Sequence, residues 1–327
     1  MRGLARLKPM AFTCLMVIGY CCVAQAQNYP EKPIHIVVPY TPGGPSDIVA
    51  RVYAAGLSQD LGQPVIVENR PGASGVVGHN IVAKSAPDGY TLIVSVFSDV
   101  VTASIGAKLP YDFVKDFQPI SGLAATPFIL VVHPSVPAGS LNELVAYAKA
   151  NPGKLSYATA GIGGGAHLAT EFFALRTGTK FLHVPYPGVV PASTDVFAGY
   201  INMMFMNANT AAEPIRAGQV RAIGVSTARR TSVAPDVPTL AELGIANFDV
   251  QTWNGLQAPA GTPMAIVNKL ADEARKIMLD PTNSAKLTAT GSEPIPSSPP
   301  EFSAYIKDEI VKWREVAKAA GIHPSEQ

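Results

Sequence analysis

The stretch VVPYTPGGPSD, residues 37–47, joins a run of apolar residues to an amphipathic segment, and its design occurs a second time in the chain. The second copy is YATAGIGGGAH, residues 157–167, which also lies between an apolar run and a helical pattern. An apolar run, a glycine-rich turn and a helix together form the strand-to-helix unit of α/β proteins. Two such units, far apart in the chain, indicate one glycine-rich turn in each of two domains.

Short apolar runs alternate with amphipathic segments on both sides of these stretches. We expect strands at residues 34–38, 65–67, 91–96, 128–132, 155–158, 181–184, 201–205 and 220–225. Apolar residues at helical spacing predict helices, for example from Val49 to Leu57 and, near the C-terminus, in stripes that begin at Val267 and Phe302. Strands that alternate with helices predict parallel β-α-β units, with helices on both faces of the sheet.

The first 26 residues have the three parts of a secretory signal peptide. Arg2, Arg6 and Lys8 give a positive start, an apolar run of about 14 residues follows, and Ala24-Gln25-Ala26 supplies small residues for a cleavage site. A transmembrane anchor is the alternative, but the run is too short to span about 30 Å of hydrocarbon as a helix. We therefore expect cleavage after Ala26 and a periplasmic mature protein that begins at Gln27.

All three cysteines lie within this signal, so the mature chain has no disulfide, no thiol nucleophile and no thiolate metal site. Cys21 follows Tyr20, a bulky residue where lipoprotein processing needs a small one, so a lipid anchor is disfavoured. The signal also carries three positive charges and no negative ones, so cleavage changes the net charge from +1 to −2. This balance implies neither a basic nucleic-acid surface nor a polybasic membrane patch.

Cleavage would leave 301 of the 327 residues, which is enough for two domains. No low-complexity linker separates them, so the boundaries must lie in ordered crossings, near Ala124-Ala125 and Thr252-Trp253. We predict a discontinuous domain 1, made of residues 27–124 and 253–327, and a domain 2 made of residues 125–252. In this division the C-terminal helices return to domain 1.

Both glycine-rich turns have the composition of an anion site. Glycines leave room for a ligand beside backbone N–H groups, and the following helix begins with unpaired N–H donors and a partial positive charge. Neither stretch contains Lys or Arg, so an anion would be held by backbone and hydroxyl donors. Each could instead be an ordinary tight turn, with Ser46 or Asp47 as a helix N-cap. One turn in each domain favours the ligand site, because open α/β sheets bind ligands at the carboxyl ends of their strands.

Patterns that would indicate a cofactor or catalysis are weak. Residues 161–166 fit the G-x-G-x-x-A dinucleotide pattern, but the acidic residue expected about 20 positions later is missing at residues 183–186. Residues 72–75 are not a G-x-S-x-G nucleophile elbow, because the second glycine comes one position early. The six histidines lack metal-ligand spacing, and His167 is more typical of a helix-start hydrogen bond than of a general base. We expect no enzyme activity, no cofactor and no metal.

A series of short motifs follows in one order from Tyr29 to about Ile322. They are PGGPSD at residues 42–47, VENRPGA at 67–73, PDGYT at 87–91, LPYD at 109–112, VPY at 184–186, AGQVR at 217–221 and PDVPTLAE at 235–242. Together they resemble the Bug family, the periplasmic receptors of tripartite tricarboxylate transporters. The chain departs from that pattern at Gly165, where many members have Ser, and at Asn207, where Asp or another polar residue often stands.

The resemblance implies an α/β, two-lobed periplasmic-binding-protein fold (type II, venus-flytrap) with two crossover strands. It implies a solute-binding protein that reversibly binds a small carboxylate between its lobes, partly through ordered waters. Its partners would be one large and one small integral membrane subunit of the transporter. A binding protein that signals to a membrane sensor without transport is the alternative. Dicarboxylates, tricarboxylates, acidic amino acids and aromatic acids all stay open as ligands.

The expected ligand-binding residues come from the two glycine-rich turns, from a third turn at residues 186–191 and from the family pattern. They are Tyr40, Thr41, Pro42, Gly43, Gly44, Ser46, Asp47, Ser98, Ala160, Gly161, Gly163, Gly164, Gly165, His167, Tyr186, Gly188, Val189, Pro191 and Asn207. No nucleic-acid partner is expected, and we expect the protein to act as a monomer.

Overall fold

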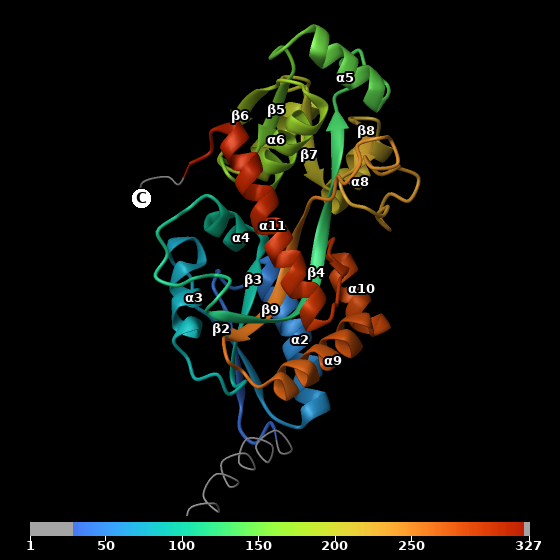
Figure 1. Ribbon diagram of the computed structural model, residues 1–327. Helices are drawn as coiled ribbons and strands as arrows, with labels where there is room; N and C mark the ends of the chain where they lie inside the picture. The colour runs from blue at the N-terminus through green and yellow to red at the C-terminus, as the bar shows by residue number, and fades with distance from the viewer. Residues whose placement is uncertain (1–28, 324–327) are drawn as a thin grey trace, which may run out of the picture.

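The computed structural model describes residues 29–323, so the predicted signal peptide and its cleavage site lie outside the described residues. Within residues 29–323, no helix is both long and apolar enough to cross a bilayer. The described chain forms two α/β halves, the lower and the upper half of Figure 1, which are joined by long strands.

The lower half is built on a parallel sheet in the order β2-β1-β3. Its strands are β1 (Ile34–Val38), β2 (Val65–Asn69) and β3 (Thr91–Val96). The helices of this half are α2 (Pro45–Leu61), α3 (Val76–Ala83) with the short 3-10 turn η1 (Ala73–Gly75) before it, α4 (Phe97–Ser104), α9 (Met264–Leu279) and α10 (Pro281–Ala289). Its core packs the apolar face of α2 against β1, β3 and α9, which buries Tyr53, Leu57 and Leu270 completely.

The upper half repeats this plan with a second parallel sheet in the order β7-β5-β6. Its strands are β5 (Ser156–Thr159), β6 (Leu182–Pro185) and β7 (Met203–Asn207), and β8 (Arg221–Val225) pairs with β4. Its helices are α5 (Leu141–Ala150), α6 (Gly165–Thr177), α7 (Val189–Phe197) and α8 (Ala208–Arg216). Each parallel strand of this half is therefore followed directly by a helix, as in the lower half.

Two antiparallel strands run through both halves: β4 (Phe117–Val132) and β9 (Gln251–Pro259). β4 pairs with β9 over residues 117–127, and over residues 128–132 it pairs with β7 and β8. The predicted crossover strands are thus present, although the sequence indicated only residues 128–132 of β4 and did not predict β9 as a strand. The short strand β10 (Glu293–Pro294) pairs with the lower part of β4.

The pairing of these strands fixes the direction of every other strand. β3 and β4 each run antiparallel to β9, so β1, β2 and β3 all point toward the upper half. β7 runs antiparallel to β4, so β5, β6 and β7 point toward the lower half. The carboxyl ends of the two parallel sheets therefore face each other across the level where the halves meet (Figure 1).

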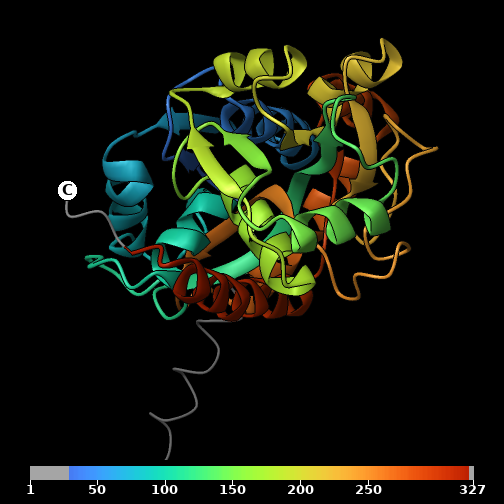
Figure 2. The ribbon, with the colours of Figure 1, turned by 90° about the horizontal axis from the view of Figure 1, so that it is seen from above.

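The predicted domain boundaries fall on adjacent strands at this level, because Ala124 pairs with Asn254 and Ala125 pairs with Trp253. The division into two domains at these residues stays a prediction. A third connection was not predicted. Helix α11 (Pro299–Ala320) packs on both halves, and its Trp313 lies against Phe97 of α4 and Phe172 of α6, with ring centroids 5.1 and 6.1 Å apart. Figure 2 shows α11 along one side of the molecule.

Candidate functional site

Six helices begin at the level where the two halves face each other. α2, α3 and α4 follow β1, β2 and β3 from below, and α6, α7 and α8 follow β5, β6 and β7 from above. The first turn of each helix has backbone N–H groups that no helical carbonyl accepts, and the helix dipole adds partial positive charge there. The fold thus directs N–H donors from both halves toward one region.

Loop 1, residues 39–44 between β1 and α2, is shaped by a left-handed glycine and by a bond to a side chain of α2. Gly43 has φ +81°, a left-handed conformation that favours glycine, and Gly44 is the residue that precedes the first helical turn. The N–H of Gly43 donates to Oδ2 of Asp47 at 3.0 Å, and the N–H of Ile48 donates to the carbonyl of Gly44 at 3.1 Å. The N-cap is Gly44 and neither Ser46 nor Asp47, so the predicted capping role of those two residues is wrong.

Asp47 is a positioning residue of loop 1 and not a free ligand group. Its side chain is buried, and besides Gly43 it accepts hydrogen bonds from Nε of Arg51 and from Nδ2 of Asn69, both at 2.9 Å. Burial would raise the pKa of Asp47, but the hydrogen bonds from Arg51, Gly43 and Asn69 hold that pKa below its ordinary value. Asp47 was predicted to bind the ligand, but its carboxylate is already used inside the protein.

Loop 2, residues 160–164 between β5 and α6, repeats the backbone of loop 1. Gly163 has φ +79°, and Gly164 precedes the first turn of α6. The N–H of Gly163 donates to Nδ1 of His167 at 3.0 Å, and the N–H of Leu168 donates to the carbonyl of Gly164 at 3.0 Å. His167 thus takes the place that Asp47 has in loop 1, and it forms the helix-start hydrogen bond that the sequence favoured.

His167 lies in a stack of aromatic rings under loop 2. Its ring is parallel to that of His183, with centroids 4.1 Å apart and planes 12° apart, and His183 stacks on Tyr157 at 4.7 Å. Burial lowers the pKa of His167 to about 4. Burial, and then the neighbouring His167, lower the pKa of His183 to about 4. Both imidazoles are therefore neutral at physiological pH, and His183 was not predicted to belong to the site.

The glycines of the two loops differ in what surrounds them. Adjacent residues aside, no described heavy atom lies within 4 Å of where a Cβ of Gly43, Gly161 or Gly163 would be, so there is free space beside these glycines, although their own N–H groups are donated within the protein. At Gly165, in contrast, a Cβ would lie 2.9 Å from the ring of Phe128 and 3.1 Å from Cγ2 of Thr252. Gly165 was predicted to make room for a ligand, but it is required by the packing of α6 against β4 and β9.

Tyr40 and Ser98 lie together at the ends of β1 and β3. The Tyr40 hydroxyl donates to Oδ1 of Asp99 at 2.7 Å and lies 3.0 Å from Oγ of Ser98. Burial, followed by the charge of Asp99, raises the pKa of Tyr40 well above its ordinary value. Behind it, Oδ2 of the buried Asp99 lies 3.4 Å from Nε2 of the buried His79. The exposed Ser98 is therefore held beside loop 1 by groups of the core.

The third turn, residues 186–188 between β6 and α7, brings Gly188, Val189 and Pro191 to the same level from above. The hydroxyl of Tyr186 donates to Oδ2 of Asp195 at 2.5 Å, and this bond raises the pKa of Tyr186 to about 12. Tyr186 was predicted to bind the ligand, but its hydroxyl is used within its own half.

The remaining predicted residues lie at the same carboxyl edges. Thr41, Pro42 and Ala160 are exposed at the tips of loops 1 and 2. Asn207 precedes α8, and its side chain makes no capping hydrogen bond within the described part of the chain. The structure thus brings the whole predicted set to the level between the halves, although the side chains of four polar members already form hydrogen bonds within the protein: Tyr40, Asp47, His167 and Tyr186.

The turn after β2 was missed as part of the site. Ala73 and Ser74 both have positive φ, +45° and +52°, which is uncommon for residues other than glycine and marks backbone strain. The turn adjoins loop 1, because a Cβ at Gly75 would lie 3.1 Å from the Tyr40 hydroxyl oxygen. Ala73 and Ser74 are exposed. The signal in the sequence was the pair Gly72 and Gly75 that flanks them.

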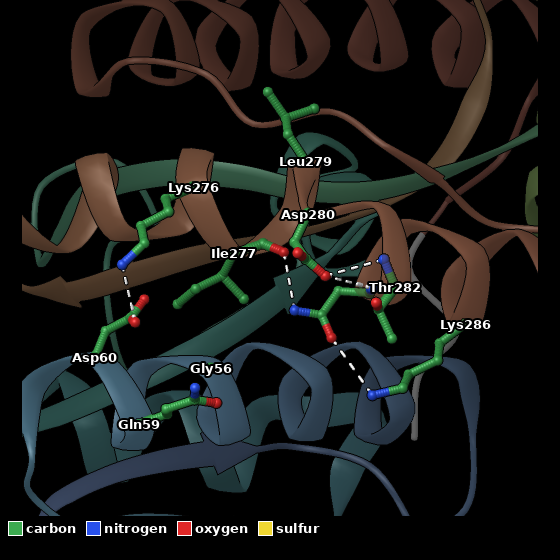
Figure 3. Close-up of a pocket in the computed structure, with 10 residues that line it drawn as sticks. Gly56, Gln59, Asp60, Lys276, Ile277, Leu279, Asp280, Thr282 and Lys286 are labelled. Carbon is green, nitrogen blue, oxygen red and sulfur yellow. Dashed lines mark hydrogen bonds and ion pairs between the residues drawn. The ribbon is translucent and has the colours of Figure 1, made fainter.

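A groove of about 530 Å³ lies elsewhere, on the outer surface of the lower half between α2, α9 and α10 (Figure 3). Its polar groups are paired with one another. Lys276 forms an ion pair with Asp60 at 2.9 Å, and Asp280 accepts from the N–H groups of Thr282 and Asn283, each at 3.0 Å. None of the predicted ligand-binding residues lines this groove. Residues 29–323 contain no cluster of three His, Cys, Asp or Glu side chains that could hold a metal.

Comparisons with known proteins agree with this architecture. The model of the "Tripartite tricarboxylate transporter family receptor" matches residues 49–322. Protein BugT of Bordetella pertussis is 36% identical over 321 residues, which cover 98% of each chain. A TctC solute-binding protein from Polaromonas, solved without ligand, superposes with a TM-score of 0.81 at 29% identity, over 89% of this chain and 99% of that one.

A structure of R. palustris Rpa4515 with adipate superposes with a TM-score of 0.70 at 34% identity, over 90% of this chain and 99% of that one. These neighbours confirm the predicted two-lobed fold, and the family match confirms the resemblance stated from the sequence. The chain belongs to the family of tripartite tricarboxylate transporter receptors, which are solute-binding receptors and not enzymes.

Proposed function

We propose that the mature protein is a periplasmic solute-binding protein that holds a small carboxylate between its two halves and delivers it to the membrane subunits of a tripartite tricarboxylate-type transporter. The observation that carries this proposal is the repeated loop geometry. Gly43 and Gly163 have nearly the same φ, and each donates its N–H to the side chain four residues later. Two loops with the same backbone geometry, one from each half, are suited to a ligand that both halves contact.

A carboxylate suits this region for electrostatic reasons. Helix starts present N–H donors, and loops 1 and 2 contain no Lys or Arg that would add a full positive charge. A hydrogen bond to a charged acceptor contributes about 1.5–3 kcal/mol, so a few backbone donors are enough for useful affinity. These contacts are all non-covalent, so such binding is reversible, as transport requires.

We assign the ligand contacts to the exposed parts of the site and positioning roles to its buried parts. In this proposal the ligand contacts the backbone N–H groups of Ser46 and Asp47, those that follow Gly164, and the side chains of Ser98 and Asn207, because Pro45 has no N–H to donate. Asp47 and His167 hold loops 1 and 2 in shape from below, through their bonds to Gly43 and Gly163. Adipate bound to Rpa4515 supports a carboxylate ligand in this family.

The two halves are proposed to close on the ligand about β4 and β9. This chain superposes better on the ligand-free Polaromonas protein than on the adipate complex, although its identity to the former is lower. That difference supports an open arrangement of the halves here. Closure would bring loop 2 toward loop 1, since both lie at the carboxyl edges that face each other.

A thermal-shift screen of the mature protein against small carboxylates tests the proposal. A ligand at 100 times its Kd adds about 2.7 kcal/mol of stability, which is readily measured. Mass spectrometry of the recovered acid then distinguishes binding from catalysis. We expect at least one acid to bind and to be recovered unchanged. If no di-, tri- or amino-carboxylate stabilised the protein, the proposal would be wrong.

A further inference from the structure

Asn254 lies on the crossover strand β9, at the level where the two halves meet. It pairs with Val96 at the end of β3 and with Ala124 of β4. The next residue back, Trp253, packs its ring against Phe302 of α11, with centroids 5.7 Å apart. Side chains of a strand alternate between its faces, so Asn254 points away from α11 and toward the face that carries α2.

The neighbours of Asn254 on that face place it between loops 1 and 2. Leu256, two residues along the strand, belongs to the core of the lower half together with Tyr53 of α2. In the other direction, Cγ2 of Thr252 lies 3.1 Å from where a Cβ of Gly165 would be, at the start of α6. Two residues of a strand span about 6.6 Å. Asn254 therefore sits on the connecting strand between the start of one helix and the start of the other.

The side-chain oxygen of Asn254 is buried without a partner among the described residues. The residue is 8% exposed, and its Oδ1 has no hydrogen-bond partner among the described residues. Nearly all buried polar groups in proteins are paired, because an unpaired one has lost its water without replacement. A leucine here would fill similar space without that cost. Oδ1 is thus an acceptor whose partner is not found within residues 29–323.

The unpaired atom is an acceptor, whereas the backbone groups that the two helix starts present to the ligand are donors. Backbone N–H groups can only donate, and an ionised carboxylate can only accept. The carboxylate of a ligand therefore suits loops 1 and 2 but cannot pair with Oδ1 of Asn254. That oxygen needs an O–H or N–H group, which a plain aliphatic dicarboxylate does not have.

Ser98 gives an independent indication of the same kind. Both oxygens of Asp99 accept hydrogen bonds, one from the Tyr40 hydroxyl and one from the N–H of Val96, each at 2.7 Å. Because Tyr40 gives its proton to Asp99, its oxygen can only accept in the 3.0 Å contact with Ser98. The Ser98 proton is thus used toward Tyr40. The lone pairs of its exposed oxygen then offer a second acceptor to the ligand.

We propose that Asn254 determines specificity by accepting a hydrogen bond from a hydroxyl or amino substituent on the carbon chain of the carboxylate ligand. The ligand class is then hydroxy- or amino-carboxylates, and unsubstituted dicarboxylates bind more weakly. This inference rests on the proposed function, because it assumes that the helix starts hold the carboxylate ends.

Calorimetric titration of the mature protein with matched acids tests the inference. The probes are succinate, malate and aspartate, and glutarate, 2-hydroxyglutarate and glutamate, so each plain acid has a hydroxy and an amino counterpart. The variants are Asn254→Leu and, in case the larger side chain does not fit, Asn254→Ala. Gln251→Leu is the matched control, because it changes an amide on the same strand at a position that pairs with Pro127 and not with β3.

We expect the unchanged protein and Gln251→Leu to prefer one substituted acid over its plain counterpart by at least about tenfold. In both Asn254 variants that preference should fall toward one while affinity for the plain acid is kept, and Asn254→Leu without ligand should be at least as stable as the unchanged protein. The inference is overturned if plain acids bind as tightly as substituted ones, or if the variants weaken all acids equally. Binding of no acid at all would overturn the proposed function as well.

Discussion

The Nδ1 atom of His167 accepts a hydrogen bond from the backbone N–H of Gly163, four positions earlier in the chain, at 3.0 Å. Asp47 makes the same bond to Gly43 in the other half. The acceptor for Gly43 is an anionic carboxylate and the acceptor for Gly163 is a neutral imidazole, yet the two glycines have nearly the same φ.

Gly164→Ala should weaken carboxylate binding by about tenfold or more, which corresponds to 1.4 kcal/mol. Gly164 has φ −72° and ψ 166°, so alanine fits its backbone, and the new Cβ would lie 3.7 Å from the nearest described atom, the Gly161 carbonyl oxygen. The methyl group would occupy space in front of the first amides of α6. Calorimetry and thermal unfolding measure both effects.

Gly139→Ala is the control for that variant, because Gly139 lies before α5, which Figure 1 places at the far end of the upper half. It should leave affinity unchanged. Normal binding by a folded Gly164→Ala protein would exclude loop 2 from the site.

Asp47→Ala should lower stability by about 1–3 kcal/mol and reduce affinity, because it leaves the donors of Gly43 and Asn69 without their buried acceptor. Arg51→Gln should cost only about 0–1 kcal/mol, because its ion pair with Asp47 involves an arginine side chain that is 53% exposed. Urea unfolding and titration of both variants test this order. If Arg51→Gln abolished binding while Asp47→Ala bound normally, a salt bridge would hold the anion.

The sequence predicts a feature of this site when the residues that produce it are close together in the chain, and it misses a feature that depends on residues far apart. Loops 1 and 2 were visible because glycine, strand and helix signals follow one another in the chain. The inward roles of Asp47 and Tyr186 depend on Asn69 and Asp195, and the helix-forming pattern does not reveal those partners. Gly165 looked like a ligand-approach glycine, because its contact with Phe128 arises only after β4 and α6 have packed.

The same reasoning explains the elements that were missed. Residues 117–127 of β4 contain Pro119 and Pro127, which cannot donate to a ladder and read as strand breakers, and the pairing with β9 shifts register near Pro119. In β9, a Cβ at Gly255 would collide with the ring of Phe302, so the glycine that weakens the strand pattern is required by α11. The sequence patterns of β4 and β9 are therefore weak, because contacts with residues far away in the chain determine which residues these strands contain.

Closure about β4 and β9 should reduce the radius of gyration when ligand binds. The two tryptophans of the chain, Trp253 on β9 and Trp313 on α11, both lie in connections between the halves, so their fluorescence should change in parallel. Small-angle scattering with and without saturating ligand measures the first effect. An unchanged radius at saturation would contradict a closing mechanism.

Stability should fall as the pH decreases from about 6.5 toward 4. The folded protein holds the pKa of His167 and of His183 near 4, below the ordinary value of 6.5, so the unfolded chain binds more protons in this window. Each kcal/mol lost lowers the melting temperature by about 2–4 °C.

His183→Gln should flatten this dependence between pH 6.5 and 5, whereas replacement of the exposed His323 should not. Melting temperatures across that range provide the test. An identical slope in the His183→Gln variant would show that other groups cause the loss of stability.

The central claim, that backbone amides from both halves hold a carboxylate, is tested most directly by a crystal structure of the mature protein with its best-binding acid. The account predicts one carboxylate oxygen within hydrogen-bond distance of N–H groups at the start of α2, and another ligand atom within the same distance of N–H groups at the start of α6. A ligand bound through an arginine or lysine side chain, or seated in the groove between α2, α9 and α10, would contradict it.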